Sequence, residues 1–235
     1  GGRVRSAACY GFLGDVHPET LLHLDLVARH EDASLPKVGR AAELLCNLMA
    51  GRPPVLWGPH EPTLAKWDTQ LIRRSLLHRG PDPSILHFSG TVWENPRFTG
   101  SLRFTWDRFK ATERITVTVG FPNEEDLPFT ALPEVVALLA EAGLLHGFQA
   151  RTHRGRADLL YAPRWQGGAV PLGIAVGSER VQRIGAEKAQ AGPIKGNLIG
   201  RGEEQAIWYP VIGEPSTALR ELERQKAYLE SADRV

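Results

Sequence analysis

The sequence predicts an α+β fold with a mainly antiparallel sheet and helices packed on one of its faces. Several strand patterns follow one another without an intervening helix, and strands that are neighbours in the chain usually pair antiparallel. A second observation is a repeated order of strand, polar or acidic loop, Leu-Pro, helix, glycine and strand, around 21–57 and 115–151. The repeat also indicates two similar strand–helix lobes, although such units are common enough to arise by chance.

The first unit begins with a strand over 21–27, whose leucines at alternate positions share one face. A helix follows over 38–51, because apolar side chains recur there at helical spacing until a glycine and two prolines stop it. Another helix is predicted over 67–78, where Gly-Pro-Asp-Pro follows it.

The second unit begins with a clear half-buried strand over 115–119, in which Ile and Val alternate with Thr. A helix over 132–143 and a strand over 148–151 complete it. Two further strands, 85–88 and 102–109, precede this unit, and the short link after the second strand suits a hairpin.

The remaining sheet elements lie in the last third of the chain. Arg154-Gly155 separates 149–153 from 156–161 and predicts a tight hairpin. Alternating apolar residues predict a strand over 170–176, and Ile-Trp-Tyr predicts a last short strand over 207–209.

No linker divides the chain, so we expect a single α+β domain over 20–215. The glycine-rich stretch 185–202 has little apolar mass and is predicted to be a mobile surface loop. Ser216 is the expected cap of a charged C-terminal helix over 216–235. The opening Gly-Gly-Arg has no apolar signal core behind it, so 1–20 is interpreted as an N-terminal extension or the remnant of a trimmed chain.

The composition excludes several classes of protein. The 28 Lys and Arg against 27 Asp and Glu give a net charge of +1, so we predict no nucleic-acid partner unless the charge is sorted by face. Cys9 and Cys46 are too few for a disulfide scaffold or a four-cysteine zinc site, and Cys46 lies in an apolar helical pattern. The low cysteine count indicates a reducing compartment, so we predict a cytoplasmic location. No run of about 18 apolar residues is present, so we predict no membrane span.

Motif searches predict neither a metal nor a cofactor. The sequence has no phosphate-binding Gly-x-x-x-x-Gly-Lys-Ser/Thr, no dinucleotide fingerprint and no Gly-x-Ser-x-Gly nucleophile turn. His60-Glu61 begins like a zinc-protease motif, but Pro62 follows and the second histidine is missing.

Two polar clusters are the candidate binding sites. The first is a rigid Gly- and Pro-containing loop that brings together Trp57, His60, Glu61, Trp67 and Asp68. It is either a recognition surface or acid/base pair, since histidine titrates near neutrality, or a structural loop whose tryptophans fill the core while Asp68 caps the following helix.

The second cluster lies at the predicted hairpin and contains Arg151, His153, Arg154 and Arg156. Three guanidinium groups could hold an acidic partner or phosphates, although hairpin tips are often simply solvated. Neither cluster contains the nucleophile, base and orienting group of a covalent catalyst.

Six short segments carry a resemblance to a known family: Trp57-Gly58-Pro59-His60-Glu61-Pro62 with Trp67-Asp68, Ile115-Thr116-Val117-Thr118-Val119-Gly120, Arg156-Ala157-Asp158-Leu159, Pro163-Arg164-Trp165, Pro171-Leu172-Gly173-Ile174-Ala175-Val176-Gly177 and Ala206-Ile207-Trp208-Tyr209-Pro210. In their order and their residues these segments are similar to an uncharacterised actinobacterial family, a domain of unknown function whose genes often lie near type VII (ESX) secretion loci. The resemblance covers most of residues 20–230 and brings no catalytic residue with it. It implies a cytosolic accessory protein of secretion or of a secreted toxin system.

The leading hypothesis is a non-enzymatic protein-binding accessory, chaperone or immunity-like protein. Its expected contact surface combines the Trp57–Asp68 loop, the arginine hairpin and the charged C-terminal helix. The rival hypothesis is a hydrolase-type enzyme that uses His60 with Glu61 or Asp68, which requires these groups to converge in a cleft. Nucleic-acid binding through Arg151, Arg154 and Arg156 is a third alternative.

Overall fold

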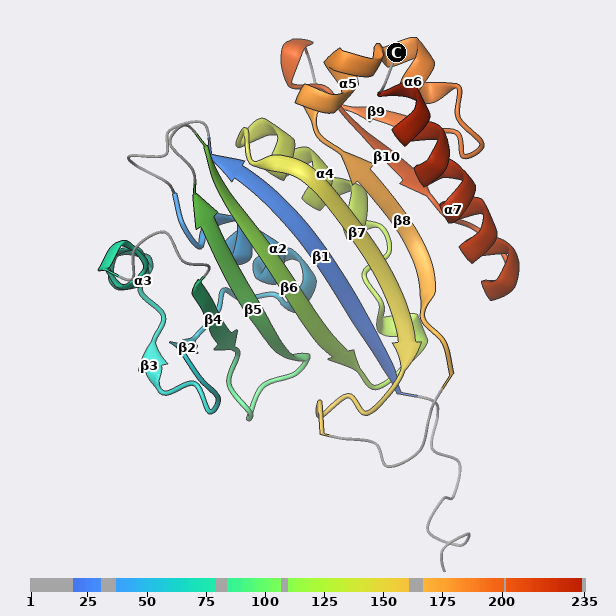
Figure 1. The fold of residues 1–235 in the computed structure, drawn as a ribbon. Coiled ribbons are helices and arrows are strands. Elements are labelled where there is room, and N and C mark those ends of the chain that lie inside the picture. The colour runs from blue at the N-terminus through green and yellow to red at the C-terminus, as the bar shows by residue number, and fades with distance from the viewer. Residues whose placement is uncertain are drawn as a thin grey trace, which may run out of the picture.

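A computed structural model describes residues 19–30, 37–78, 84–106, 110–160, 167–200 and 202–233. Ten strands form one sheet in the order β3-β2-β4-β5-β6-β1-β7-β8-β10-β9, and every described pairing is antiparallel (Figure 1). The strands are β1 (Thr20–His30), β2 (Leu56–Gly58), β3 (Ala65–Lys66), β4 (Ser84–Ser89), β5 (Arg97–Trp106), β6 (Ala111–Phe121), β7 (Leu145–Arg154), β8 (Val170–Val176), β9 (Asn197–Ile199) and β10 (Ala206–Pro210). The predicted α+β class and the antiparallel sheet are confirmed.

Six helices accompany the sheet within the described residues: α2 (Arg40–Ala50), α3 (Thr69–His78), α4 (Ala131–Glu141), α5 (Ser178–Ile184), α6 (Ala186–Gln190) and α7 (Pro215–Ala232). Short 3-10 turns lie at Glu124–Asp126 and Gly202–Glu204. None of the described helices is long and apolar enough to cross a membrane.

One face of the sheet carries the larger hydrophobic core. Alternate residues of the central strands point into it, among them Leu24 of β1 and Val117 of β6, which are directly paired and almost fully buried. Helices α2 and α4 pack on each other and cover this face, and Cys46 of α2 is a buried free thiol within it. Burial raises the pKa of that thiol far above its usual range, and Cys46 is a small buried core residue, in agreement with its apolar helical pattern.

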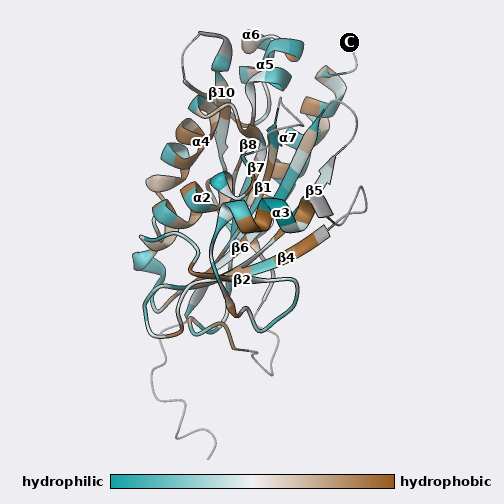
Figure 2. Cartoon of the chain, turned by 90° about the vertical axis from the view of Figure 1, so that its left-hand side faces the viewer, coloured by the Kyte–Doolittle hydropathy of each residue, from teal (hydrophilic) through white to brown (hydrophobic). Residues whose placement is uncertain are grey.

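A second, smaller core lies on the opposite face, at the β8–β10 end of the sheet. Ile174 of β8 and Tyr209 of β10 project into it, whereas Ala175 and Trp208, their neighbours in the chain, belong to the first core. Helices α5, α6 and α7 cover this core, with Leu222 and Leu229 of α7 buried in it. Seen from the side, α2 and α4 lie on one side of the sheet and α7 on the other (Figure 2).

The prediction that all helices pack on one face is therefore wrong. A strand buried on both faces needs a helix on each, and β8 and β10 are such strands because apolar residues occupy both of their alternating sets. The two similar units, 21–57 and 115–151, do not divide the molecule into lobes either. Their first strands, β1 and β6, are paired at the centre of one continuous sheet.

Three local predictions need correction. Strand β7 continues to Arg154 and pairs with β8, so the predicted tight hairpin at Arg154-Gly155 is replaced by a long connection. Within the predicted loop 185–202, α6 and β9 form and Ala189 and Ile194 are buried. Helix α7 begins at Pro215, a residue suited to the first helical turn, and Ser216 does not cap it.

Candidate functional site

Among the described residues, no helix covers the face of the sheet opposite α2 and α4 over β4, β5, β6, β1 and β7, and we call these positions the open face. The segment after β7 lies over one end of it, where Ala157 approaches Gly120. The residues of the open face are the other alternating set of the strands: Ile85, His87, Ser89, Arg97, Thr99, Ser101, Arg103, Thr105, Thr112, Arg114, Thr116, Thr118, Gly120, Leu21, His23, Asp25, Val27, Arg29, Gly147, Gln149, Arg151 and His153. Most of these side chains are polar, because the period of two sends the large apolar residues to the helix-covered face.

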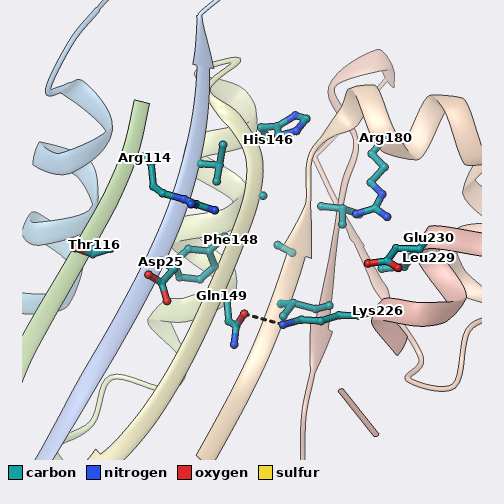
Figure 3. A pocket seen from close by; sticks show the side chains of 15 residues that line it. Asp25, Arg114, Thr116, His146, Phe148, Gln149, Arg180, Lys226, Leu229 and Glu230 are labelled. Atoms are coloured by element: carbon teal, nitrogen blue, oxygen red, sulfur yellow. Dashed lines mark hydrogen bonds between the residues drawn. The ribbon is translucent and has the colours of Figure 1, made fainter. Parts of the chain in front are cut away.

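A groove runs along the open face where α7 rises beside the sheet (Figure 3). Its volume is about 620 Å³, within the range of ligand-binding pockets. Val27 and Gly147 line it from the sheet side. Lys226 and Glu230 line it from α7, and the amine of Lys226 donates a hydrogen bond of 3.0 Å to the amide oxygen of Gln149 on β7.

A small charged network around Glu179 of α5 lies beside the end of the groove that His146 lines. Arg29 donates a hydrogen bond to this carboxylate, and Lys110 lies 3.5 Å from it. Burial opposes ionisation of Glu179, but Arg29 and Lys110 outweigh it and lower the pKa of the carboxyl group. His146 contacts Arg29 over 3.1 Å, and burial followed by Arg29 lowers the pKa of this imidazole, which favours its neutral form.

The lower part of the open face holds a pair of stacked imidazoles. His23 and His153 have ring centroids 4.2 Å apart and Nε2 atoms 3.3 Å apart, and Nδ1 of His23 lies 2.8 Å from the hydroxyl of Thr118. Burial and then the neighbouring His153 lower the pKa of His23 to about 4. Beside the pair, Arg151 forms an ion pair of 3.2 Å with Asp25.

The predicted loop cluster divides into structural and exposed residues. Trp57 is buried in the first core, and the Trp67 indole packs edge-on against Phe88 and donates a hydrogen bond of 3.0 Å to Glu43 of α2. The Asp68 carboxylate accepts hydrogen bonds from two backbone amides in the first turn of α3, so Asp68 is the helix cap that the structural interpretation predicts.

His60 and Glu61, by contrast, lie at the surface on the loop between β2 and β3. Both side chains are exposed, and Glu61 lies 3.9 Å from His87 of β4. Among the described residues no hydrogen bond or ion pair joins His60 to Glu61 or Asp68. The convergence that the hydrolase hypothesis requires is therefore not seen in this part of the chain.

The predicted arginine cluster is also divided. Arg151 and His153 are on the open face, as described above. Arg154 is exposed at the end of β7, and Arg156 forms a local bidentate pair with Asp158, its Nε lying 2.9 Å from the carboxylate. Five strand steps of about 4.8 Å each separate β2 from β7 in the sheet order, so the loop and the arginines do not form one patch.

Several residues of the open face were not predicted as site residues from the sequence, notably Arg29, Arg103, Arg114 and Gln149. Lys226 belongs to the charged C-terminal helix, which was part of the predicted contact surface. The alternation of polar with apolar residues was visible in β6, but it indicates only which residues face away from the core. It does not show that a helix from the end of the chain will form one wall of a groove beside them. In the described part of the chain, no group of three or more His, Cys, Asp or Glu side chains converges to hold a metal ion.

The fold and site define an α+β protein with a ten-stranded antiparallel sheet and a polar, arginine-bearing open face beside a C-terminal helix. The chain belongs to the DUF6177 family, a family of unknown function. The family model for the DUF6177 C-terminal domain matches residues 21–233, which is nearly the whole chain. No curated protein and no solved structure matches the chain.

Proposed function

We propose that this chain is a non-enzymatic binding domain that holds a segment of a protein partner on the open face, beside α7. In the cell it would act in the cytoplasm as an accessory, chaperone or immunity-like protein of type VII secretion or of a secreted toxin system. The link to secretion rests on the resemblance of the sequence motifs described above, and the binding mode rests on the geometry.

The observation that carries the proposal is the groove between the sheet and α7. It is about 620 Å³ in volume and combines apolar side chains, such as Val27, with amide and charged groups, such as Gln149 and Lys226. Side chains at alternate positions of the sheet strands form the floor of the groove, and α7, which forms its wall, packs on β8 through the second core. A preformed groove of this kind suits an extended segment, because little ordering is needed on the protein side.

Two carboxylates near the groove are held in ion pairs with neighbouring cations. Glu179 is held by Arg29 and Lys110, and Asp25 is held by Arg151. A general base needs a free lone pair directed at a substrate, and a nucleophile needs a base beside it. The geometry thus favours binding over the hydrolase alternative built on His60.

Site-specific photo-cross-linking in the native host tests the proposal. A photoreactive residue replaces Gln149 in the groove or, as the matched control, Asn47, which is exposed on α2 behind the sheet. We expect one protein partner to be cross-linked from position 149 and not from position 47, and the purified pair to form a complex again. Equal cross-linking from both positions, or partner capture from position 47 alone, would contradict the proposed surface.

A further inference from the structure

We propose that the partner segment is acidic and binds across Arg103 and Arg114 on the open face. The inference rests on the proposed function and adds the chemistry of the occupant. It starts from the distribution of charge. The whole chain is close to neutral, with 28 basic and 27 acidic residues, but the charged open-face positions of the five strands are one aspartate, Asp25, and five arginines, Arg29, Arg97, Arg103, Arg114 and Arg151.

Three of the five arginines already have an anion nearby. Arg29 is bonded to Glu179 and Arg151 to Asp25. Arg97 lies near Asp158, whose pKa is lowered to about 2, first by the hydrogen bond from Arg156 and in small part by Arg97. These pairs leave the positive charge of the open face concentrated on the two remaining arginines.

Arg103 and Arg114 are directly opposite each other on β5 and β6, and both are exposed. Neither makes a hydrogen bond or an ion pair within the described residues. Like charges placed opposite each other on neighbouring strands destabilise a sheet, and two guanidinium groups side by side match a carboxylate that bridges them. A carboxylate of the partner would therefore relieve a repulsion as well as form new bonds.

The groove continues from this pair towards α7. Arg114 lines the groove together with Val27, its neighbour across the β6–β1 pairing, and Arg180 and Lys226 line the facing side (Figure 3). Two carboxylates also line the groove, Asp25, which is paired with Arg151, and Glu230 of α7. A segment with carboxylates and small apolar side chains would thus meet Arg114 on one side, Arg180 and Lys226 on the other, and an apolar strip between them. Charge complementarity of this kind selects the partner and raises the association rate.

Nucleic acid is the other polyanion that a basic sheet face can bind, but the open face lacks the groups that hold bases. Sheet surfaces that bind single strands stack the bases on aromatic side chains. No Phe, Tyr or Trp occupies an open-face position of β4, β5, β6, β1 or β7. The near-neutral net charge also provides little general attraction for a phosphate backbone.

The test measures the affinity of the purified chain for a fluorescein-labelled peptide of about 12 residues, in which Glu and Asp alternate with Ser and Val. The comparison peptide replaces Glu and Asp by Gln and Asn. The variant R103E/R114E removes the proposed contact. The matched control R220E/R224E makes the same charge change on exposed residues of α7, and helical periodicity places them away from the buried residues and from Lys226.

We expect the acidic peptide to bind at least about tenfold more tightly than the amide peptide at low salt, and the preference to shrink at about 0.3 M salt. R103E/R114E should weaken binding of the acidic peptide about tenfold or more, whereas R220E/R224E should change it by less than about threefold. Unchanged thermal unfolding of both variants would show that the losses are local.

Equal losses in the two variants, or no preference for the acidic peptide, would overturn the inference. Tighter binding of oligo(dT) than of the acidic peptide, lost in R103E/R114E, would also overturn it and assign the face to nucleic acid. The outcomes separate the two proposals. If a partner is cross-linked at position 149 but R103E/R114E does not change its affinity, only the inference of an acidic segment is contradicted. If the acidic peptide binds but no partner is cross-linked at position 149, the proposed function is contradicted.

Discussion

Replacement of Glu113 is the perturbation whose magnitude follows most directly from the structure. Glu113 projects from β6 into the larger core and is fully buried. One carboxylate oxygen accepts a hydrogen bond of 2.8 Å from the backbone amide of Gly39, just before α2, and the other lies 3.1 Å from Nε2 of the buried His30 on β1. The side chain thus joins two central strands to the start of a helix.

Glu113→Ala leaves the amide of Gly39 and the imidazole of His30 without partners in the core. Each unsatisfied buried group costs about 1–3 kcal/mol, and the alanine variant leaves two of them. We therefore expect the free energy of unfolding to fall by about 2–6 kcal/mol. Glu113→Gln keeps an oxygen acceptor for Gly39 and offers an N–H to Nε2 of His30, so its cost should be about 1–2 kcal/mol.

Urea denaturation, monitored by tryptophan fluorescence and by far-UV circular dichroism, measures the free energy of unfolding of both variants. Coincident transitions by the two probes establish that the comparison is valid. A loss below about 1 kcal/mol for the alanine variant would refute the reasoning, as would equal losses for alanine and glutamine, because either result means that these hydrogen bonds do not hold the three elements together.

Three further predictions concern stability. The pKa of His23 is lowered to about 4 by burial and then by His153, so on acidification the imidazole is protonated in the unfolded chain before it is protonated in the folded chain. The free energy of unfolding should therefore fall by about 1–2 kcal/mol as the pH drops from about 6.5 towards 4. Urea titrations at several pH values should show a smaller fall for His23→Gln. Asp68→Ala should cost about 1 kcal/mol through loss of the α3 cap, with Asp68→Asn close to wild type by the same assay. Gly120→Ala would place its Cβ 2.1 Å from a backbone carbonyl oxygen and should lower the melting temperature, whereas Gly147→Ala meets no atom closer than 3.9 Å and should not.

Much of the fold was predictable because it depends on local patterns. The alternation of apolar residues in β1 and β6 identifies half-buried strands, and the helical stripe of α2 ends at a glycine, as predicted. The same patterns could not reveal that helices cover both faces. That arrangement depends on where α7 packs, and its contact with β8 joins residues far apart in the sequence.

The candidate site was only partly predictable for the same reason. Trp57 and Asp68 attracted attention as conspicuous residues, but one fills the core and the other caps a helix. Arg103 and Arg114 were inconspicuous in the sequence, since isolated arginines in strands are ordinary surface residues. Their significance comes from strand register, which places them side by side, and register is set by the whole sheet.

The central claim is that the open face beside α7 binds an acidic segment of a protein partner across Arg103 and Arg114. The dissociation constant of the complex with the partner cross-linked at position 149, measured by calorimetry for R103E/R114E and for R220E/R224E, tests it most directly. We predict an affinity at least about tenfold weaker for the first variant and within about threefold of wild type for the second. Wild-type affinity in R103E/R114E, or an equal loss in both variants, would contradict the claim.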